Sequence, residues 1–371
     1  MDEAATRDGT RRFRDRLAGT IPPEHFRAGP NGLLLSSIGI GTYLGSPDDA
    51  TDAAYGQALV AAVALGTNVV DSAINYRAQR SERVIGMALA ALIAEGELQR
   101  DEVVICTKGG YLPFDGDYPA DAGRYFQDTY VRSGLLTPAD LVAGSHSLAP
   151  RYLLDQIERS RRNLRVATVD VYYLHNPETQ LTAVDRTTFH TRMTGAIRVL
   201  ERAVDQGKIA CYGVATWNGF RVGAGEREYL ALADLVELAE REAGKSHHFR
   251  VVQLPCNLAM PEAFTLRNQR VGDHFGSLVE AADELGVKVV ASAALLQGQL
   301  AGQMPEILAQ AMVGLDTDAQ RSIQFVRSTP GITTALVGMR RRAHAEENLA
   351  VARRPPASHD DFLRLFTARE G

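Results

Sequence analysis

The chain has 371 residues, of which 45% are hydrophobic and 23% are charged, and its formal net charge at pH 7 is -5. This composition is typical of a globular enzyme with a large core. The basic block Arg340, Arg341 and Arg342 is too short for a nucleic-acid-binding surface, and the longest apolar run, residues 58–65, is too short to span a membrane. We therefore expect neither a nucleic acid nor a membrane as a partner.

The cysteines and the N-terminus indicate the compartment. Cys106, Cys211 and Cys256 form an odd set without CxxC spacing, so we expect neither a disulfide framework nor a metal site. The first twenty residues mix both signs of charge and contain no apolar run, which is not the pattern of a secretory signal. These features predict a cytoplasmic protein.

Apolar runs that read as buried strands recur along the chain after residue 33. Most of them are continuous Val, Ile, Ala and Leu segments, as expected when helices cover both faces of a strand. We predict strands at residues 37–43, 68–73, 103–108, 169–175, 210–215, 250–254, 288–293 and 333–337.

Helical patterns alternate with these strands, and several end at a glycine. We predict helices at residues 51–65, 81–95, 189–206, 228–243, 275–285, 317–327 and 344–351, with another that begins at Pro150. Eight strands alternating with eight helices predict an α/β fold, a closed (β/α)8 TIM barrel with long loops after the strands. We expect residues 1–32 to be an N-terminal extension and residues 33–371 to be one barrel domain, with an inserted loop at residues 111–149.

Four polar residues lie at or just after the carboxyl ends of consecutive predicted strands. They are Asp71, Tyr76, Lys108 and His175. Active sites of such barrels lie at this end, so we expect the four side chains to meet. A buried lysine needs an anion to stay charged, and Asp71 is placed to supply it.

This set of residues suggests a reaction. A charged Lys108 would lower the pKa of the neighbouring Tyr76 phenol, so that Tyr76 can act as a general acid. His175 would hydrogen-bond the same substrate oxygen. Delivery of a proton to an oxygen, without a metal or a nucleophile, fits the reduction of a carbonyl by hydride from a cofactor.

The segments DSAINY, TKGG and LHNPE resemble the aldo-keto reductase superfamily, whose Asp, Tyr, Lys and His tetrad occurs in this order. The resemblance implies that Tyr76 is the proton donor, that Lys108 and Asp71 tune it, and that His175 orients the substrate. It also implies a nicotinamide cofactor bound at the barrel mouth without a Rossmann fold.

The cofactor residues follow from the same resemblance. Gln253 falls on the family glutamine that bonds the nicotinamide carboxamide, and Thr216 replaces an asparagine of a family motif. Ser292 stands where an aromatic platform is common. The other implied cofactor-binding residues are Ala293, Leu295, Gly298, Arg340, His344, Glu347 and Asn348. We expect Arg340 to bind a 2'-phosphate, which favours NADP, while the absence of a family lysine after the seventh strand leaves NAD open.

The substrate is less defined than the chemistry. The 111–149 insertion mixes aromatic rings and carboxylates, which suits a sugar-like carbonyl, although a lid packed by its own aromatic rings would have the same composition. Two other functions remain open. One is a nicotinamide-binding regulatory subunit, and the other is a lyase that forms a Schiff base on Lys108.

Overall fold

The computed structural model describes residues 4–302, 304, 312 and 314–364. Eight parallel strands close into a barrel in the order β11-β12-β3-β4-β5-β6-β7-β8. The strands are β3 (Ile38–Gly41), β4 (Val69–Asp71), β5 (Val104–Gly109), β6 (Val169–His175), β7 (Ile209–Ala215), β8 (Phe249–Pro255), β11 (Lys288–Ser292) and β12 (Ile332–Gly338). The predicted (β/α)8 barrel is therefore confirmed, and every predicted strand is present.

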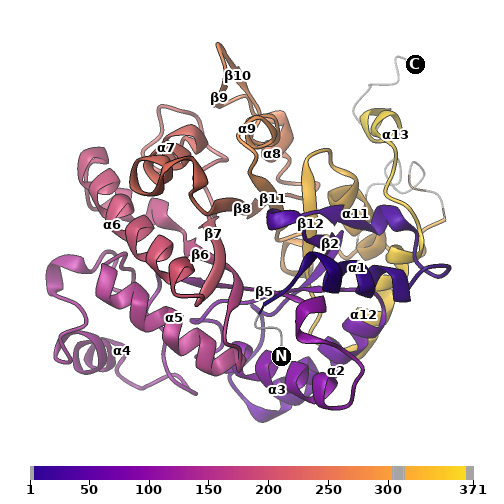
Figure 1. Ribbon diagram of the computed structural model, residues 1–371, viewed down its shortest axis with the longest axis horizontal. Coiled ribbons are helices and arrows are strands. Elements are labelled where there is room, and N and C mark those ends of the chain that lie inside the picture. The colour runs from indigo at the N-terminus through magenta and orange to yellow at the C-terminus, as the bar shows by residue number, and fades with distance from the viewer. Residues whose placement is uncertain (1–3, 303, 305–311, 313, 365–371) are drawn as a thin grey trace.

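The main helices surround this barrel (Figure 1). They are α2 (Asp49–Ala64), α3 (Arg80–Ala94), α5 (Pro150–Leu164), α6 (Arg186–Asp205), α7 (Leu232–Ala243), α9 (Leu278–Glu284), α11 (Asp318–Ser328) and α12 (Arg342–Leu349). Several begin at a side chain that accepts a hydrogen bond from the first turn, as Asp48 does for α2, Asp185 for α6 and Ser277 for α9. In the described residues, no helix is long and apolar enough to cross a membrane.

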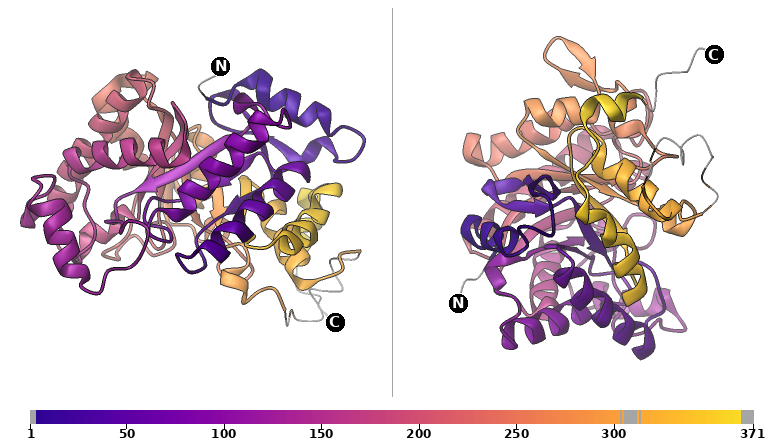
Figure 2. Two further views of the ribbon diagram at one scale, coloured as in Figure 1. Left: turned by 90° about the horizontal axis from the view of Figure 1, so that it is seen from below. Right: turned by 90° about the vertical axis from the view of Figure 1, so that its right-hand side faces the viewer.

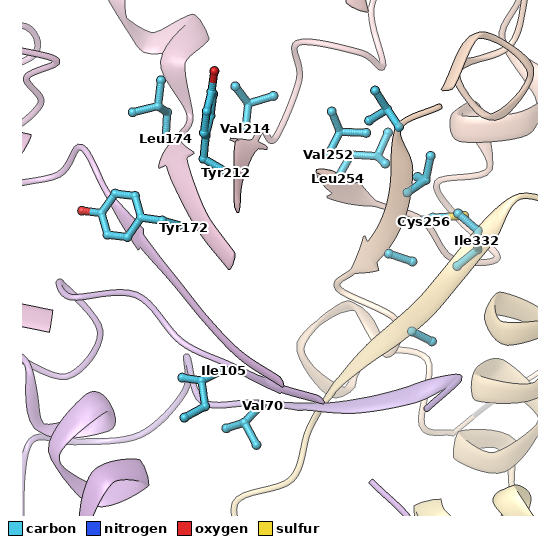
Figure 3. Packing of buried hydrophobic residues seen from close by; sticks show 14 of the residues in the cluster. Val70, Ile105, Tyr172, Leu174, Tyr212, Val214, Val252, Leu254, Cys256 and Ile332 are labelled. Carbon is cyan, nitrogen blue, oxygen red and sulfur yellow. The ribbon is translucent and has the colours of Figure 1, made fainter. Parts of the chain in front are cut away.

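Side chains along each strand alternate between two apolar layers. On β5, Val104 and Cys106 belong to a cluster inside the barrel, whereas Ile105 belongs to the layer between the strands and the helices. Figure 3 shows this outer layer, with Val70, Ile105 and Tyr172 on neighbouring strands. The alternation fixes which residues at the strand ends point into the barrel.

The N-terminal segment covers one end of the barrel. It contains α1 (Arg7–Arg16), β1 (Phe26–Ala28) and β2 (Leu34–Ser36), and the two strands pair as an antiparallel hairpin. Leu33 and Leu35 join the cluster inside the barrel. Arg12 and Arg16 of α1 form ion pairs with Asp101 and Glu102 at the start of β5.

Additional short elements lie in the loops. They are α4 (Ala122–Phe126), α8 (Glu262–Thr265), α13 (His359–Arg364), β9 (Gln269–Val271), β10 (His274–Gly276), the π-helical turn η4 (Gln127–Val131), and the 3-10 turns η1 (Pro23–His25), η2 (Pro30–Gly32), η3 (Arg100–Glu102), η5 (Pro138–Asp140), η6 (Pro177–Thr182), η7 (Gly244–Ser246), η8 (Leu296–Gly298) and η9 (Ala350–Arg353). The β9–β10 hairpin projects from the body of the molecule (Figures 1 and 2).

Two predicted helices start later than expected. The helix predicted at 228–243 begins at Leu232, and the helix predicted at 275–285 begins at Leu278. In the second case Phe275 belongs to β10, and the Ser277 hydroxyl then caps the helix. The apolar residue before the cap had been counted as part of the helix.

Candidate active site

On four strands, a polar side chain near the carboxyl end follows the apolar side chains that point into the barrel. Each lies two positions after an inward-facing apolar residue of its strand, so it points in the same direction. They are Asp71 on β4, Lys108 on β5, His175 on β6 and Gln253 on β8. Tyr76 follows in the loop after β4.

Lys108 and Asp71 form a buried ion pair. The Lys108 ammonium donates hydrogen bonds to the Asp71 carboxylate and, over 2.7 Å, to the carbonyl oxygen of Ser72. Gln253 Nε2 donates to the other carboxylate oxygen of Asp71 over 2.9 Å. Burial alone lowers the pKa of Lys108, but Asp71 and Tyr76 raise this pKa above its ordinary value. Lys108 is therefore held as a cation.

The Tyr76 ring lies beside this ion pair, with Lys108 Nζ 5.2 Å from the ring centre. The ring also forms edge contacts with Tyr43 and His175, at centroid distances of 5.0 and 5.8 Å. Burial raises the pKa of the Tyr76 phenol, and the charge of Lys108 opposes this rise. The prediction that the Tyr76 pKa lies below its ordinary value is therefore wrong, because burial raises this pKa by more than the Lys108 ammonium lowers it.

His175 is a neutral imidazole in these surroundings. Burial lowers its pKa well below the usual value, and Lys108 and His146 lower it further. His175 Nδ1 is buried and has no hydrogen-bond partner. The neutral ring can donate one hydrogen bond to a substrate oxygen.

A cavity of about 710 Å³ opens at this end of the barrel. The predicted site residues that line it are Asp71, Tyr76, His175, Thr216, Gln253, Ala293, Leu295, Gly298, Arg340, His344, Glu347 and Asn348. Lys108 is not part of the lining, because it lies below the surface against Asp71. The predicted catalytic and cofactor residues are therefore brought together around one cavity.

The part of the cavity that Arg340 lines suits an anionic group. Arg340 precedes α12 and has no hydrogen bond or ion pair to any described residue. The first turn of α12 leaves backbone N–H groups without a side-chain cap, since Arg341 at the cap position makes no such bond. An unpaired guanidinium beside a helix N-terminus is a suitable site for a phosphate.

The loop after β11 has an unusual backbone. Ala293, Leu296 and Gln297 have φ angles of 54°, 44° and 55°, in the left-handed region that non-glycine residues rarely adopt. Residues of this loop line the cavity together with Tyr76 and Arg340. Strain of this kind concentrates at ligand-binding sites.

The chain matches a known family over most of its length. A model of the aldo/keto reductase family matches residues 37–365. The chain belongs to the aldo/keto reductase family. This is the family that the sequence segments around Asp71, Lys108 and His175 resemble.

Solved structures share the fold of this chain. An aldo/keto reductase from Klebsiella pneumoniae, solved with NADP and acetate, is 20% identical, with 94% of this chain and 97% of that chain covered and a TM-score of 0.62. A glycerol dehydrogenase from Gluconobacter oxydans is 18% identical, with 93% and 94% covered and a TM-score of 0.61.

A relative is also found by sequence. The 6-dehydroglucose reductase of Novosphingobium aromaticivorans is 25% identical over 211 residues. The match covers 55% of this chain and 55% of the relative, so the chain spans about half the length of that protein.

Several residues that line the cavity were not identified from the sequence. They are Tyr43, Tyr55, Asn75, Asn176 and Trp217, together with Tyr111, which had been noted only as an aromatic residue of the insertion. Asn75, Asn176 and Trp217 each adjoin a residue that had been identified. The loop position after a strand was therefore the available signal, because all such loops meet at one end of a barrel.

The Thr216 hydroxyl is held by partners within the protein. Its hydroxyl donates to the Glu178 carboxylate over 2.6 Å and accepts a hydrogen bond from the Gly219 N–H over 2.7 Å. The same Glu178 oxygen accepts from the Trp217 N–H. Thr216 lines the cavity while its hydroxyl holds the loop that carries Trp217.

Proposed function

We propose that this protein is an NADP(H)-dependent carbonyl reductase in which Tyr76 is the general acid and base. The observation that carries the proposal is the position of the Tyr76 ring at a deep cavity, between the Lys108–Asp71 ion pair and the neutral imidazole of His175. This arrangement can protonate an oxygen and stabilise the phenolate that remains.

The proposed reaction assigns a separate task to each group. A bound nicotinamide cofactor supplies the hydride to the carbonyl carbon. His175 donates a hydrogen bond to the carbonyl oxygen, and Tyr76 transfers its proton to that oxygen as negative charge develops. The Lys108 ammonium stabilises the phenolate form of Tyr76. Asp71 keeps Lys108 charged and in place.

The cavity lining supports a dinucleotide cofactor. Tyr76 lines the cavity together with Gln253, which bonds Asp71, and with Arg340, which precedes α12. An arginine in the lining without a partner among the described residues favours a cofactor with an additional phosphate. The Klebsiella pneumoniae relative was solved with NADP, which agrees with this choice.

The lining near Tyr76 supports a small hydroxylated carbonyl as substrate. Tyr43 and Trp217 are 55% and 40% exposed, so their rings are available for contact with a sugar face. Asn176 adds an amide that hydrogen-bonds the Tyr111 hydroxyl over 3.3 Å. The 25% identical relative is a 6-dehydroglucose reductase, which agrees with a sugar-like substrate.

The insertion contributes less to the substrate site than its composition suggested. Its rings Phe114, Tyr125, Phe126 and Tyr130 contact one another, and Phe114 and Phe126 are stacked at 4.8 Å. Among its described aromatic residues, Tyr111 lines the cavity. The interpretation of this segment as a lid packed by its own aromatic rings is the better supported one.

The environment of Lys108 argues against a Schiff-base lyase. A lysine must lose its proton to attack a carbonyl, whereas Asp71 keeps Lys108 charged and below the cavity surface. A regulatory subunit without turnover remains the competing function. The three cysteines are free and buried, which supports the proposal that the enzyme acts in the reducing cytoplasm.

A substrate panel tests the proposal. Aldehydes, ketones, aldoses and keto-sugars are mixed with the protein and either NADPH or NADH, and the nicotinamide absorbance is followed. We expect turnover with at least one hydroxylated carbonyl, and a higher kcat/KM with NADPH than with NADH. Binding of NADPH without turnover across the whole panel would contradict the reductase and support the regulatory subunit.

A further inference from the structure

A chain of buried and partly buried hydrogen bonds ends on the backbone of His175. Arg192 on α6 donates to Gln180 Oε1 over 2.5 Å, and Gln180 Nε2 lies 2.7 Å from His146 Nδ1. His146 Nε2 lies 2.7 Å from the carbonyl oxygen of His175. His146 belongs to the 111–149 insertion and is completely buried.

The donors along this chain follow from chemistry. The Gln180 amide nitrogen can only donate, so His146 Nδ1 accepts and His146 Nε2 carries the proton. His146 Nε2 then donates to the His175 carbonyl oxygen. Burial lowers the pKa of His146 to about 4, so this neutral form persists at neutral pH. Both ring nitrogens of His146 are thus used, and its orientation is fixed.

The neighbouring backbone is shaped to admit this contact. Gly110 has a φ of 148°, and a Cβ there would lie 2.9 Å from the His175 carbonyl oxygen and 3.0 Å from His146 Nε2. The Tyr111 ring meets both imidazoles edge-on, at 4.9 Å from His146 and 5.1 Å from His175. A side chain at position 110 would therefore crowd both atoms of this hydrogen bond.

The hydrogen bond from His146 reaches the backbone at the point where β6 ends and the chain turns. His175 ends β6, and Asn176 immediately adopts a left-handed φ of 44°. The His175 ring has no hydrogen bond of its own at the buried Nδ1. The orientation of the His175 ring therefore depends on the His175 backbone and on the neighbouring rings, because no hydrogen bond to Nδ1 holds it.

We infer that His146 is a positioning residue, which holds the His175 backbone so that the His175 ring meets the substrate oxygen beside Tyr76. By this contact His146 supports the reaction although it does not line the cavity. The inference rests on the proposed reductase function, in which His175 donates to the carbonyl oxygen.

Two substitutions at position 146 separate positioning from general stability. His146→Phe keeps a ring against Tyr111 but removes the donor, whereas His146→Gln places an amide N–H near the position of Nε2. The kcat is calculated per cofactor-binding site, so that unfolded protein does not count. We expect His146→Phe to lower this kcat about 10-fold and to change the Kd for NADPH less than 2-fold. We expect His146→Gln to restore kcat to within about 3-fold of the unsubstituted enzyme. His274→Phe, on the exposed β10, is the control substitution.

The outcomes are distinct. Equal kcat values per site for His146→Phe and the unsubstituted enzyme would overturn the inference, as would equal losses in the Phe and Gln variants. The imidazole NMR signals of His175 provide a measurement that does not need turnover. They should shift in His146→Phe and stay near their original positions in His146→Gln. If no carbonyl is reduced by the unsubstituted protein, the proposed function fails, and the NMR comparison alone decides the positioning role.

Discussion

The Lys108–Asp71 ion pair is enclosed, with side-chain exposures of 1% and 6%. Two charges removed from water are stable only when each satisfies the other, and here Gln253 and the Ser72 carbonyl complete the hydrogen bonds. The same ammonium lies 5.2 Å from the centre of the Tyr76 ring. In the proposed mechanism the pair therefore serves both stability and chemistry, and substitutions can separate the two.

Lys108→Met leaves the Asp71 carboxylate buried without its counter-ion. We expect the free energy of unfolding to fall by about 3 to 5 kcal/mol and kcat to fall at least 100-fold. Adding Asp71→Asn should recover most of the stability but not the activity, because the phenolate still lacks its cation. Denaturant unfolding and steady-state kinetics measure the two effects, and recovery of activity in the double variant would contradict the role of Lys108.

A substitution of Arg340 tests whether the protein prefers NADPH to NADH. Arg340→Ala should raise the Kd for NADPH at least 10-fold and the Kd for NADH less than 2-fold, because a 2'-phosphate loses its partner. Arg341→Ala removes an exposed arginine one position away and is the matched control. Fluorescence titration gives both constants, and equal effects on the two cofactors would refute the phosphate contact.

Site residues that end a strand could be predicted from the sequence, whereas site residues in loops could not. Asp71, Lys108 and His175 end continuous apolar strands, so their direction and proximity follow from strand order. Tyr43 and His146 lie in loops whose courses are set by tertiary contacts, such as the bond from His146 to the His175 carbonyl. Local sequence contains no comparable signal for such contacts.

At the scale of the element, the strands and helices of the barrel follow from their apolar periodicity, whereas α1 was not predicted. This helix buries only Gly9, Thr10 and Phe13, and its first residues are strongly charged. Its position depends on the ion pairs to Asp101 and Glu102, which lie far along the chain. Phe13 is the one large apolar side chain that α1 buries, so the segment lacks the apolar stripe by which the other helices were recognised.

The N-terminal segment also contains a histidine that should make stability depend on pH. His25 bonds the Gly66 carbonyl and the Ser37 hydroxyl, and Arg327 and Arg27 lie nearby. Burial, followed by the charge of Arg327, lowers the pKa of His25 from 6.5 to about 3. Below pH 6.5 the unfolded chain binds a proton that the folded protein excludes, so stability falls as the pH falls towards 3.

The expected size of this effect is about 1.4 kcal/mol for each pH unit below 6.5. Urea unfolding at several pH values should show this slope, added to those of other groups. His25→Gln should reduce the slope by close to one proton, whatever its effect on stability at pH 7. An unchanged slope in His25→Gln would mean that His25 is protonated in the folded state.

On the scale of the whole molecule, the two ends of the barrel have different tasks. The β1–β2 hairpin closes one end by placing Leu33 and Leu35 against the inner cluster, while the other end holds the cavity. Barrel enzymes in general place stability at the first end and chemistry at the second. This division explains how long loops after the strands coexist with a closed core.

Leu35→Ala tests whether the hairpin end of the barrel contributes to stability without affecting the cavity. Leu35 is 3% exposed, so its truncation should lower the free energy of unfolding by about 2 to 5 kcal/mol. Below the new unfolding temperature, kcat and KM should stay within 2-fold of the original values, because the cavity lies at the opposite end. Thermal unfolding and kinetics on the same sample measure this, and a large change in kcat would show that the two ends are coupled.

The central claim is that the Tyr76 hydroxyl transfers the proton to a carbonyl oxygen. Tyr76→Phe removes that oxygen and keeps the ring, so the most direct measurement is NADPH-dependent carbonyl reduction by this variant, with NADPH binding measured in parallel. The account predicts that kcat falls at least 100-fold while the Kd for NADPH changes less than 2-fold. Reduction that stays within a few-fold of the unsubstituted enzyme would contradict it.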